Sequence, residues 1–211
     1  MTQERKFIEA SKRLMQMEEF LQKEFSRAGY SHIDIQRTPL SMRITVYAHK
    51  PGMIIGRGGK NIDAMTEALK SQFGIENPQL EVVEVPNPDL DANIVAKQIA
   101  AAIERGLNYK RVVNLTIQRS MESGAVGIAI RTSGKVGGEM SRTEKFSAGY
   151  LKYAGDPADT LVHKAYARAN VKLGVIGIQV RILNTPPQEL ELLKKIRGMK
   201  PEENKVEEKT A

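Results

Sequence analysis

The stretch that decides the fold of the first half is HKPGMIIGRGGKN, which covers residues 49–61. Its quartet Gly56-Arg57-Gly58-Gly59 lies between an isoleucine pair and an expected amphipathic helix that carries Ile62, Met65, Leu69 and Phe73 on one face. Glycines let a backbone approach a sugar-phosphate chain, and the following helix N-terminus offers free N–H groups and a positive dipole end. The stretch therefore predicts a loop that holds a nucleic-acid backbone. Its candidate residues are Lys50, Gly56, Arg57, Gly58, Gly59 and Lys60.

Two classes of nucleotide-binding loop look similar but do not fit. A Walker loop requires a glycine at position 54 and a Ser or Thr at position 61, where this chain has Ile54 and Asn61. The dinucleotide fingerprint also fails, because its third glycine would fall at Asn61. The loop therefore indicates no nucleotide cofactor.

Outward from the loop, the first half reads as one small α+β unit. Apolar residues at helical spacing predict an N-terminal helix through Leu14 and Phe25 that ends before Gly29. Strands are expected near residues 32–37 and 42–49, with a turn between them, and a third strand follows the glycine-loop helix at about residues 80–85. The order is helix, strand, strand, helix, strand. The prolines at positions 86 and 88 predict a domain boundary, so the first domain is expected over residues 1–86.

The second half is expected to be an α/β sandwich domain over residues 87–190. A helix should begin near Asp91, capped by Asp89 or Asp91, and a second helix should cover residues 108–123. Period-two alternation then predicts a strand near residues 126–130, which a basic glycine loop at 133–138 interrupts. Further strands are expected near residues 141–150, 160–167 and 174–183. We expect the two helices to pack on one face of a mainly antiparallel sheet. A short helix after Pro186 and a mixed-charge tail over residues 191–211 would follow.

Composition narrows the class of partner. Lys+Arg number 32 against 25 Asp+Glu, for a net charge of +7 and a pI of about 9.5, and such an excess attracts polyanions. The alternative is a solvated basic surface without a partner. Aromatic residues make up 5% with no Trp, so base-stacking rings are not expected to form most of any binding surface.

Other classes of protein are disfavoured. The absence of Cys excludes disulfides and thiolate metal sites, and the three histidines lie in different expected elements, so we expect no metal site. No apolar run approaches the roughly 18 residues that span a bilayer, and the N-terminus lacks the apolar core of a signal peptide. We expect a soluble cytoplasmic protein with no membrane partner.

These motifs carry a resemblance. Residues 1–86 resemble a type II KH domain, and residues 87–190 are similar to the second part of the universal small-subunit ribosomal protein S-three family. The long helical start and short C-terminal extension resemble its archaeal and eukaryotic branch. The matching stretches are residues 49–62, 123–128, 134–138 with Arg142-Thr143, and 174–180.

The resemblance implies a structural protein of the small-subunit head, with no enzymatic activity, cofactor or small-molecule substrate. It implies binding to small-subunit ribosomal RNA and to the neighbouring proteins S-ten and S-fourteen, and a KH loop that clamps about four nucleotides of single-stranded backbone. The helix at 108–123 would face incoming messenger RNA through Lys110, Arg111, Asn114 and Gln118. Asn114 departs from the basic residue of bacterial members, which argues against a strong helicase-like activity. Ribosomal RNA phosphate would be met by Arg131, Lys135, Arg142 and Lys145, and by Arg181.

Two alternatives stay open. A free-standing KH regulator would account for residues 56–59 but leaves the long second domain unexplained. A nucleic-acid lyase, linked to eukaryotic relatives, would need a lysine with a neutral amine. Lys60 beside Arg57 is the nearest candidate, and exposure would keep it protonated.

Overall fold

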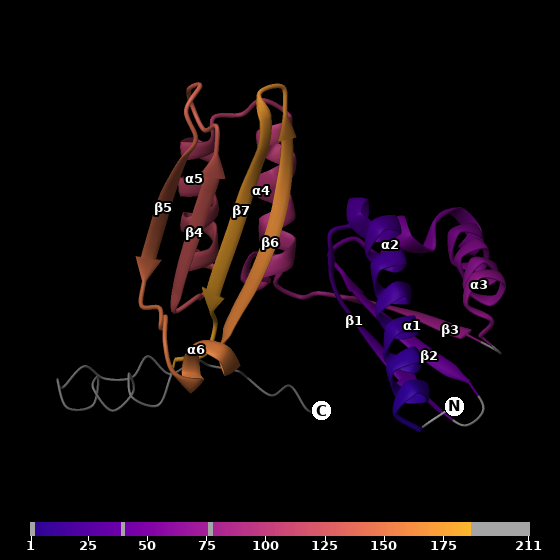
Figure 1. The fold of residues 1–211 in the computed structure, drawn as a ribbon. Helices are drawn as coiled ribbons and strands as arrows, with labels where there is room; N and C mark the ends of the chain where they lie inside the picture. The colour runs from indigo at the N-terminus through magenta and orange to yellow at the C-terminus, as the bar shows by residue number, and fades with distance from the viewer. Residues whose placement is uncertain (1–2, 39–40, 76–77, 187–211) are drawn as a thin grey trace, which may run out of the picture.

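Two separate β-sheets organise the chain in the computed structural model, which describes residues 3–38, 41–75 and 78–186 (Figure 1). The first sheet has three strands in the order β1-β2-β3, and the second has four in the order β5-β4-β7-β6. Each sheet packs with helices around its own hydrophobic cluster. The α+β class predicted from the sequence is confirmed.

The first unit follows the predicted order of helix, two strands, helix and strand. Strand β2 pairs antiparallel with β1 and parallel with β3. Its elements are α1 (Gln3–Glu24), the 3-10 turn η1 (Phe25–Ala28), β1 (Tyr30–Arg37), β2 (Met42–Ala48), α2 (Pro51–Ile55), the 3-10 turn η2 (Arg57–Gly59), α3 (Lys60–Phe73) and β3 (Pro78–Glu84).

The hydrophobic core of the first unit is formed by apolar residues of the predicted strands and helices. Alternate residues of β2, Ile44 and Val46, are buried against Met17 and Leu21 of α1 and Leu69 of α3. This packing leaves the opposite side of β2 to polar residues, as expected for a strand with one buried face.

Helix α2 differs from the sequence prediction, which treated residues 49–61 as a continuous loop. Pro51 suits a first helical position because it needs no N–H partner there, and its φ is already helical. The turn ends at Gly56, whose φ of 71° lies in the left-handed region. The glycine quartet is therefore a short connection between two helices.

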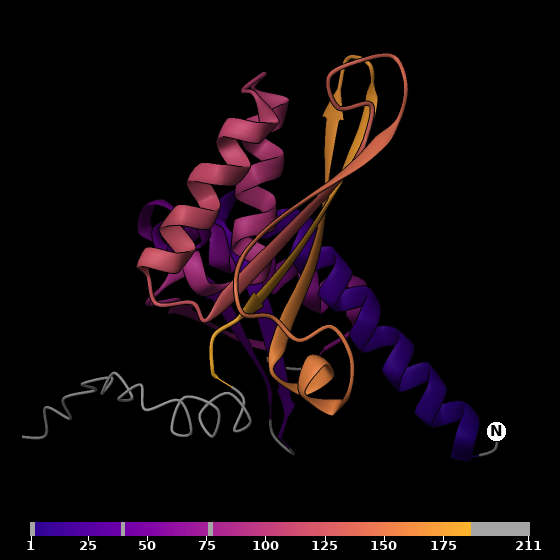
Figure 2. The same cartoon turned by 90° about the vertical axis from the view of Figure 1, so that its left-hand side faces the viewer.

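The second unit is an antiparallel sheet with α4 and α5 on one face, as expected (Figure 2). Ile128 and Ile130 of the sheet are buried against Val95 and Ile99 of α4 and Val113 of α5. The elements are the 3-10 turn η3 (Pro88–Leu90), α4 (Ala92–Glu104), α5 (Tyr109–Glu122), β4 (Gly127–Gly134), β5 (Arg142–Gly149), α6 (Asp156–Thr160), β6 (Val162–Val171) and β7 (Gly174–Leu183).

Two details of the second unit bear on the sequence predictions. The single turn α6 was not predicted, because a helix of this length shows no apolar periodicity. The helix expected after Pro186 and the mixed-charge tail lie outside the described residues. Within the described ranges, none of the helices is long and apolar enough to cross a membrane.

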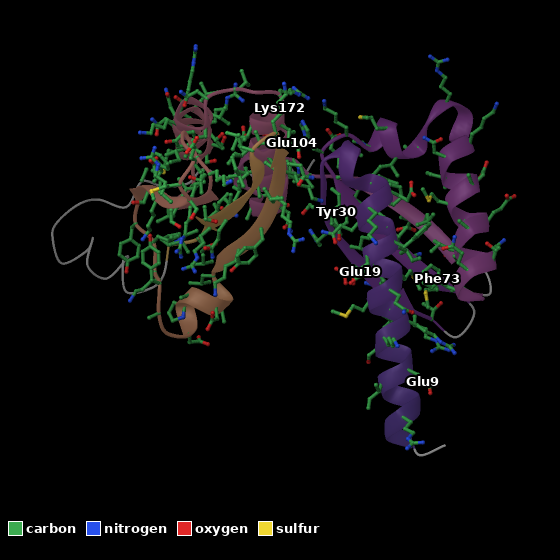
Figure 3. The ribbon with its side chains drawn as sticks, turned by 45° about the horizontal axis from the view of Figure 1, so that its top comes forward. Glu9, Glu19, Tyr30, Phe73, Glu104 and Lys172 are labelled. Atoms are coloured by element: carbon green, nitrogen blue, oxygen red, sulfur yellow. The ribbon has the colours of Figure 1, made fainter. Side chains whose placement is uncertain are left out.

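Hydrogen bonds connect the N-terminus of α4 to the N-terminus of β1. Asp91 is the N-cap of α4, and its Oδ1 accepts from the backbone N–H of Asn93 at 2.8 Å, while its Oδ2 accepts from the Ser31 hydroxyl. Asn93 Nδ2 donates to the Ser31 carbonyl at 3.1 Å. Lys97 Nζ donates to the Tyr30 carbonyl at 3.3 Å and lies 4.2 Å from the centre of its ring. Tyr30 itself lies on the side of the first unit that faces the second (Figure 3). This junction connects the two units with partly buried polar contacts.

Replacing Asp91 with Ala should lower stability more than replacing Asp89, the other predicted cap. Loss of an N-cap costs about 1 kcal/mol, and the Ser31 hydroxyl also loses its hydrogen bond to the Asp91 carboxylate. For a chain of this size the melting temperature should fall by roughly 2–4 °C for each kcal/mol. Equal shifts for Asp91→Ala and Asp89→Ala in thermal denaturation would contradict the assignment of the cap.

The contacts between α4 and β1 should also make the stability of the protein depend on pH. Burial lowers the pKa of Lys97 from 10.5 to about 8, against the opposing effect of Asp91. Between about pH 8 and pH 10.5 the unfolded chain then binds more protons, so Lys97 should make stability rise with pH in that window. Burial raises the pKa of Tyr30 to about 12, so its stabilising contribution is lost only above pH 10.

The Lys97 pKa can be measured from the ¹³Cε chemical shift in an NMR titration. The signal that disappears in Lys97→Met should have a midpoint near pH 8. A midpoint at the ordinary lysine value would mean that the junction opens in solution.

Candidate nucleic-acid interface

The glycine loop lies between α2 and α3, and its backbone has the left-handed conformations that glycine permits. Gly56, Gly58 and Gly59 have φ of 71°, 65° and 79°. The predicted cations Lys50, Arg57 and Lys60 are all exposed around it. The structure thus brings together the residues predicted for this loop.

The glycines of the loop differ in what lies above them. A Cβ added to Gly56 would come within 2.6 Å of the Asn61 side chain, which in turn donates to the Met53 carbonyl at 3.4 Å. Above Gly58 there is open space, and above Gly59 the nearest atom is an Asp63 oxygen at 4.0 Å. Gly56 is therefore required for packing within the loop, whereas Gly58 and Gly59 leave room for a ligand backbone.

The N-terminus of α3 is also available. Its N-cap is Gly59, which has no side chain to accept from the N–H groups of the first turn. Such groups bind anions well, and Lys60 adds a positive charge at the same place. Asp63 in the first turn is the one acidic residue there, and it reduces the positive field of the helix end.

Helix α5 carries the second predicted set. Asn108 caps it by accepting from the Lys110 backbone N–H at 3.0 Å. Arg111, Asn114 and Gln118 are exposed on one side of the helix, as their spacing predicted, and Gln118 donates to Glu122 at 2.9 Å. These side chains form one polar face.

Lys110 lies apart from this face. Its Nζ is 4.0 Å from Glu144 of β5, and the same carboxylate lies 3.6 Å from Nε of Arg142. Arg142 Nε also donates to the Val136 carbonyl at 3.2 Å, inside the basic glycine loop. Glu144 therefore offsets part of the charge of two residues that were predicted to contact RNA.

The remaining predicted phosphate contacts fall in two places. Lys135 is exposed in the loop beyond β4. Arg131 and Lys145 are cross-strand neighbours on the sheet face opposite α4 and α5, and Arg181 is on the same face of β7. Tyr153, Tyr166 and Gln179 contribute to this face and were missed by the sequence analysis. Strand alternation could have indicated the last two, but only the strand order reveals their neighbours.

Comparison with known proteins matches each half of the chain to a family. The family described as "KH domain" matches residues 16–90, and the family described as "Ribosomal protein S3, C-terminal domain" matches residues 99–182. Among curated relatives, the "Small ribosomal subunit protein uS3" of Methanocaldococcus jannaschii is 48% identical over 180 residues, covering 85% of this chain and 86% of the relative. Its namesake from Methanococcus maripaludis is 46% identical over 193 residues, covering 90% and 92%. These archaeal relatives also agree with the branch that the sequence resembles. The chain therefore belongs to the uS3 family of small ribosomal subunit proteins.

Proposed function

We propose that this protein is a non-catalytic component of the head of the small ribosomal subunit, which binds ribosomal RNA and lines the path of incoming messenger RNA. The observation that carries the proposal is the glycine loop with open space above Gly58 and Gly59, next to a helix N-terminus without a side-chain cap. A backbone without side chains and a set of free N–H groups suit a sugar-phosphate chain.

Helix α5 is the proposed contact with messenger RNA. Its exposed face holds the cation Arg111, the amides of Asn114 and Gln118, and a second cation, Arg119, in the last turn. Such groups hold phosphate and sugar without reading sequence, which suits a path that every message must follow. Any unwinding would be passive, with its energy supplied by ribosome translocation. We place the protein in the cytoplasm, on the ribosome beside S-ten and S-fourteen.

The glycine loop can be tested with a charged and a neutral pair of substitutions. Gly58→Asp with Gly59→Asp should weaken binding of single-stranded RNA about thirty-fold, because each added charge near a phosphate costs roughly 1 kcal/mol in water. Gly58→Asn with Gly59→Asn is the matched control, since Asn has a similar size and tolerates positive φ. Fluorescence anisotropy would measure both affinities. Equal affinity for the Asp and Asn pairs would remove this loop from the interface.

The α5 face can be tested in translation. Lys110→Ala with Arg111→Ala should slow translation through structured messages while subunit assembly stays intact. Most of the effect should come from Arg111, because Glu144 offsets the charge of Lys110. Asn114→Lys should act in the opposite direction by adding a cation beside Arg111. The measurement is the translation rate of each variant on paired structured and unstructured messages. If the ratio of the two rates is the same in all variants and the wild type, the α5 face does not contact messenger RNA as proposed.

A further inference from the structure

The second sheet presents a large basic face that the helices leave uncovered. Helices α4 and α5 pack on one side, and within the described residues only the α6 turn and the segment before it approach the other (Figure 2). Strand register puts the cations Arg131, Lys145, Lys164, Arg168 and Arg181 on this side. At the outward positions of these four strands the sequence has neither Asp nor Glu. Among the described residues, Asp159 of α6 pairs with one of these cations, Lys164.

The cations and rings lie in adjacent cross-strand rows. One row runs Lys145, Arg131, Gln179 and Tyr166 across β5, β4, β7 and β6. The next row contains Ala129, Arg181 and Lys164. Neighbouring strands are about 4.8 Å apart, so each charged group is within reach of the next.

A hollow of about 360 Å³ lies at the centre of this face, lined by Arg131, Lys145, Tyr153, Gln179 and Arg181 around Ala129. The Tyr153 ring is 4.1 Å from Lys145 Nζ and 5.7 Å from the Arg181 guanidinium carbon. The cations therefore stay beside an aromatic surface that is itself 49% exposed. A hollow with both charges and a ring suits a ligand that has both anionic groups and flat faces.

The side chains of this face are held in place. With the Gln179 carboxamide turned so that its oxygen faces the donors around it, that oxygen accepts from Nε and Nη2 of Arg181 at 3.2 and 3.1 Å, and from the Tyr166 hydroxyl at 3.0 Å. Arg181 is thus fixed through hydrogen bonds that leave part of its guanidinium free. Tyr166 is fixed at its hydroxyl while its ring stays 72% exposed. An exposed ring held in this way is ready to stack on another flat group.

We infer that this face docks an unpaired segment of small-subunit ribosomal RNA. Arg131, Lys145 and Arg181 hold its phosphates, and Tyr153 and Tyr166 stack on its bases. Base stacking on aromatic side chains of a sheet requires splayed bases, so the segment is unpaired. Ribosomal RNA is the source because the proposed messenger contact, α5, covers the opposite face of the sheet (Figure 2). The inference rests on the proposed RNA-binding function and adds the surface and the form of the RNA.

The first test uses the full chain and a short unpaired RNA rich in A and U. The triple variant Arg131→Ala, Lys145→Ala and Arg181→Ala should bind more weakly, and its salt dependence should fall by about 2 in slope, since each phosphate contact of a single strand contributes roughly 0.7. The matched control removes three exposed lysines elsewhere, Lys12, Lys70 and Lys172, the last at the tip of the β6–β7 hairpin (Figure 3). The control should keep the wild-type slope.

The rings are tested separately from the charges. Tyr153→Ala with Tyr166→Ala should weaken binding about tenfold per ring at unchanged salt slope, and Phe at both positions should restore it. Circular dichroism of each variant guards against loss of fold. No difference between the Ala pair and the Phe pair would overturn the stacking role.

Combination with the glycine-loop variant separates this inference from the proposed function. If Gly58→Asp with Gly59→Asp weakens binding while the sheet triple behaves like its lysine control, the sheet inference is wrong and the loop proposal stands. If the sheet triple alone weakens binding, the inference stands and the loop proposal is wrong.

A photoreactive aromatic residue in place of Tyr166 identifies the occupant in assembled small subunits. Crosslinks to ribosomal RNA support the inference. Crosslinks only to messenger RNA or to a neighbouring protein would overturn it.

Discussion

Burial of one side of each sheet is the constraint on which the remaining structure depends. In the second unit, Ile128 and Ile130 must face α4 and α5 to form a core, and successive residues of a strand point to opposite faces. Arg131 is therefore forced outward, and cross-strand register puts Lys145 beside it. A slip of one residue would exchange the two faces and bury these charges. The basic surface is thus a consequence of how the core is built.

In the glycine loop, the constraint is the backbone conformation and close packing at Gly56. Gly56 accepts a conformation and a close contact with Asn61 that a side chain would prevent, and this fixes the turn between α2 and α3. Once the turn is fixed, Gly58 and Gly59 are presented with nothing above them, beside the start of α3. The loop needs no catalytic group, because holding a backbone requires only space, N–H donors and nearby positive charge.

Most of the architecture could be predicted because local signals agree with the fold. Alternation in β2 and β4, helical spacing in α3, and the capping position of Asp91 each indicate the element that forms. The short helix α2 and the turn α6 were not predicted, because a single helical turn is too short to show a hydrophobic periodicity. Residues 50, 56–60, 111, 114 and 118 could be grouped in advance because each group lies within one loop or one helix.

What the sequence could not reveal depends on contacts between distant elements. Glu144 draws Lys110 away from the α5 face and engages Arg142, and no local pattern in the chain signals this pairing. Tyr166, Gln179 and Arg181 become neighbours only through the pairing of β6 with β7. The basic face of the second sheet is formed only when the strands pair in the order β5-β4-β7-β6, so its tyrosines could not be recognised as part of a site before the sheet was known.

The central claim, that this protein is a structural component of the small ribosomal subunit, is tested most directly by sedimentation. A cell lysate would be run through a sucrose gradient at low magnesium, where the subunits separate, and each fraction would be probed for this protein. The account predicts a peak with the small subunit at near-equal stoichiometry that survives a moderate salt wash. Recovery at the top of the gradient would contradict it and favour a free KH-type RNA-binding protein.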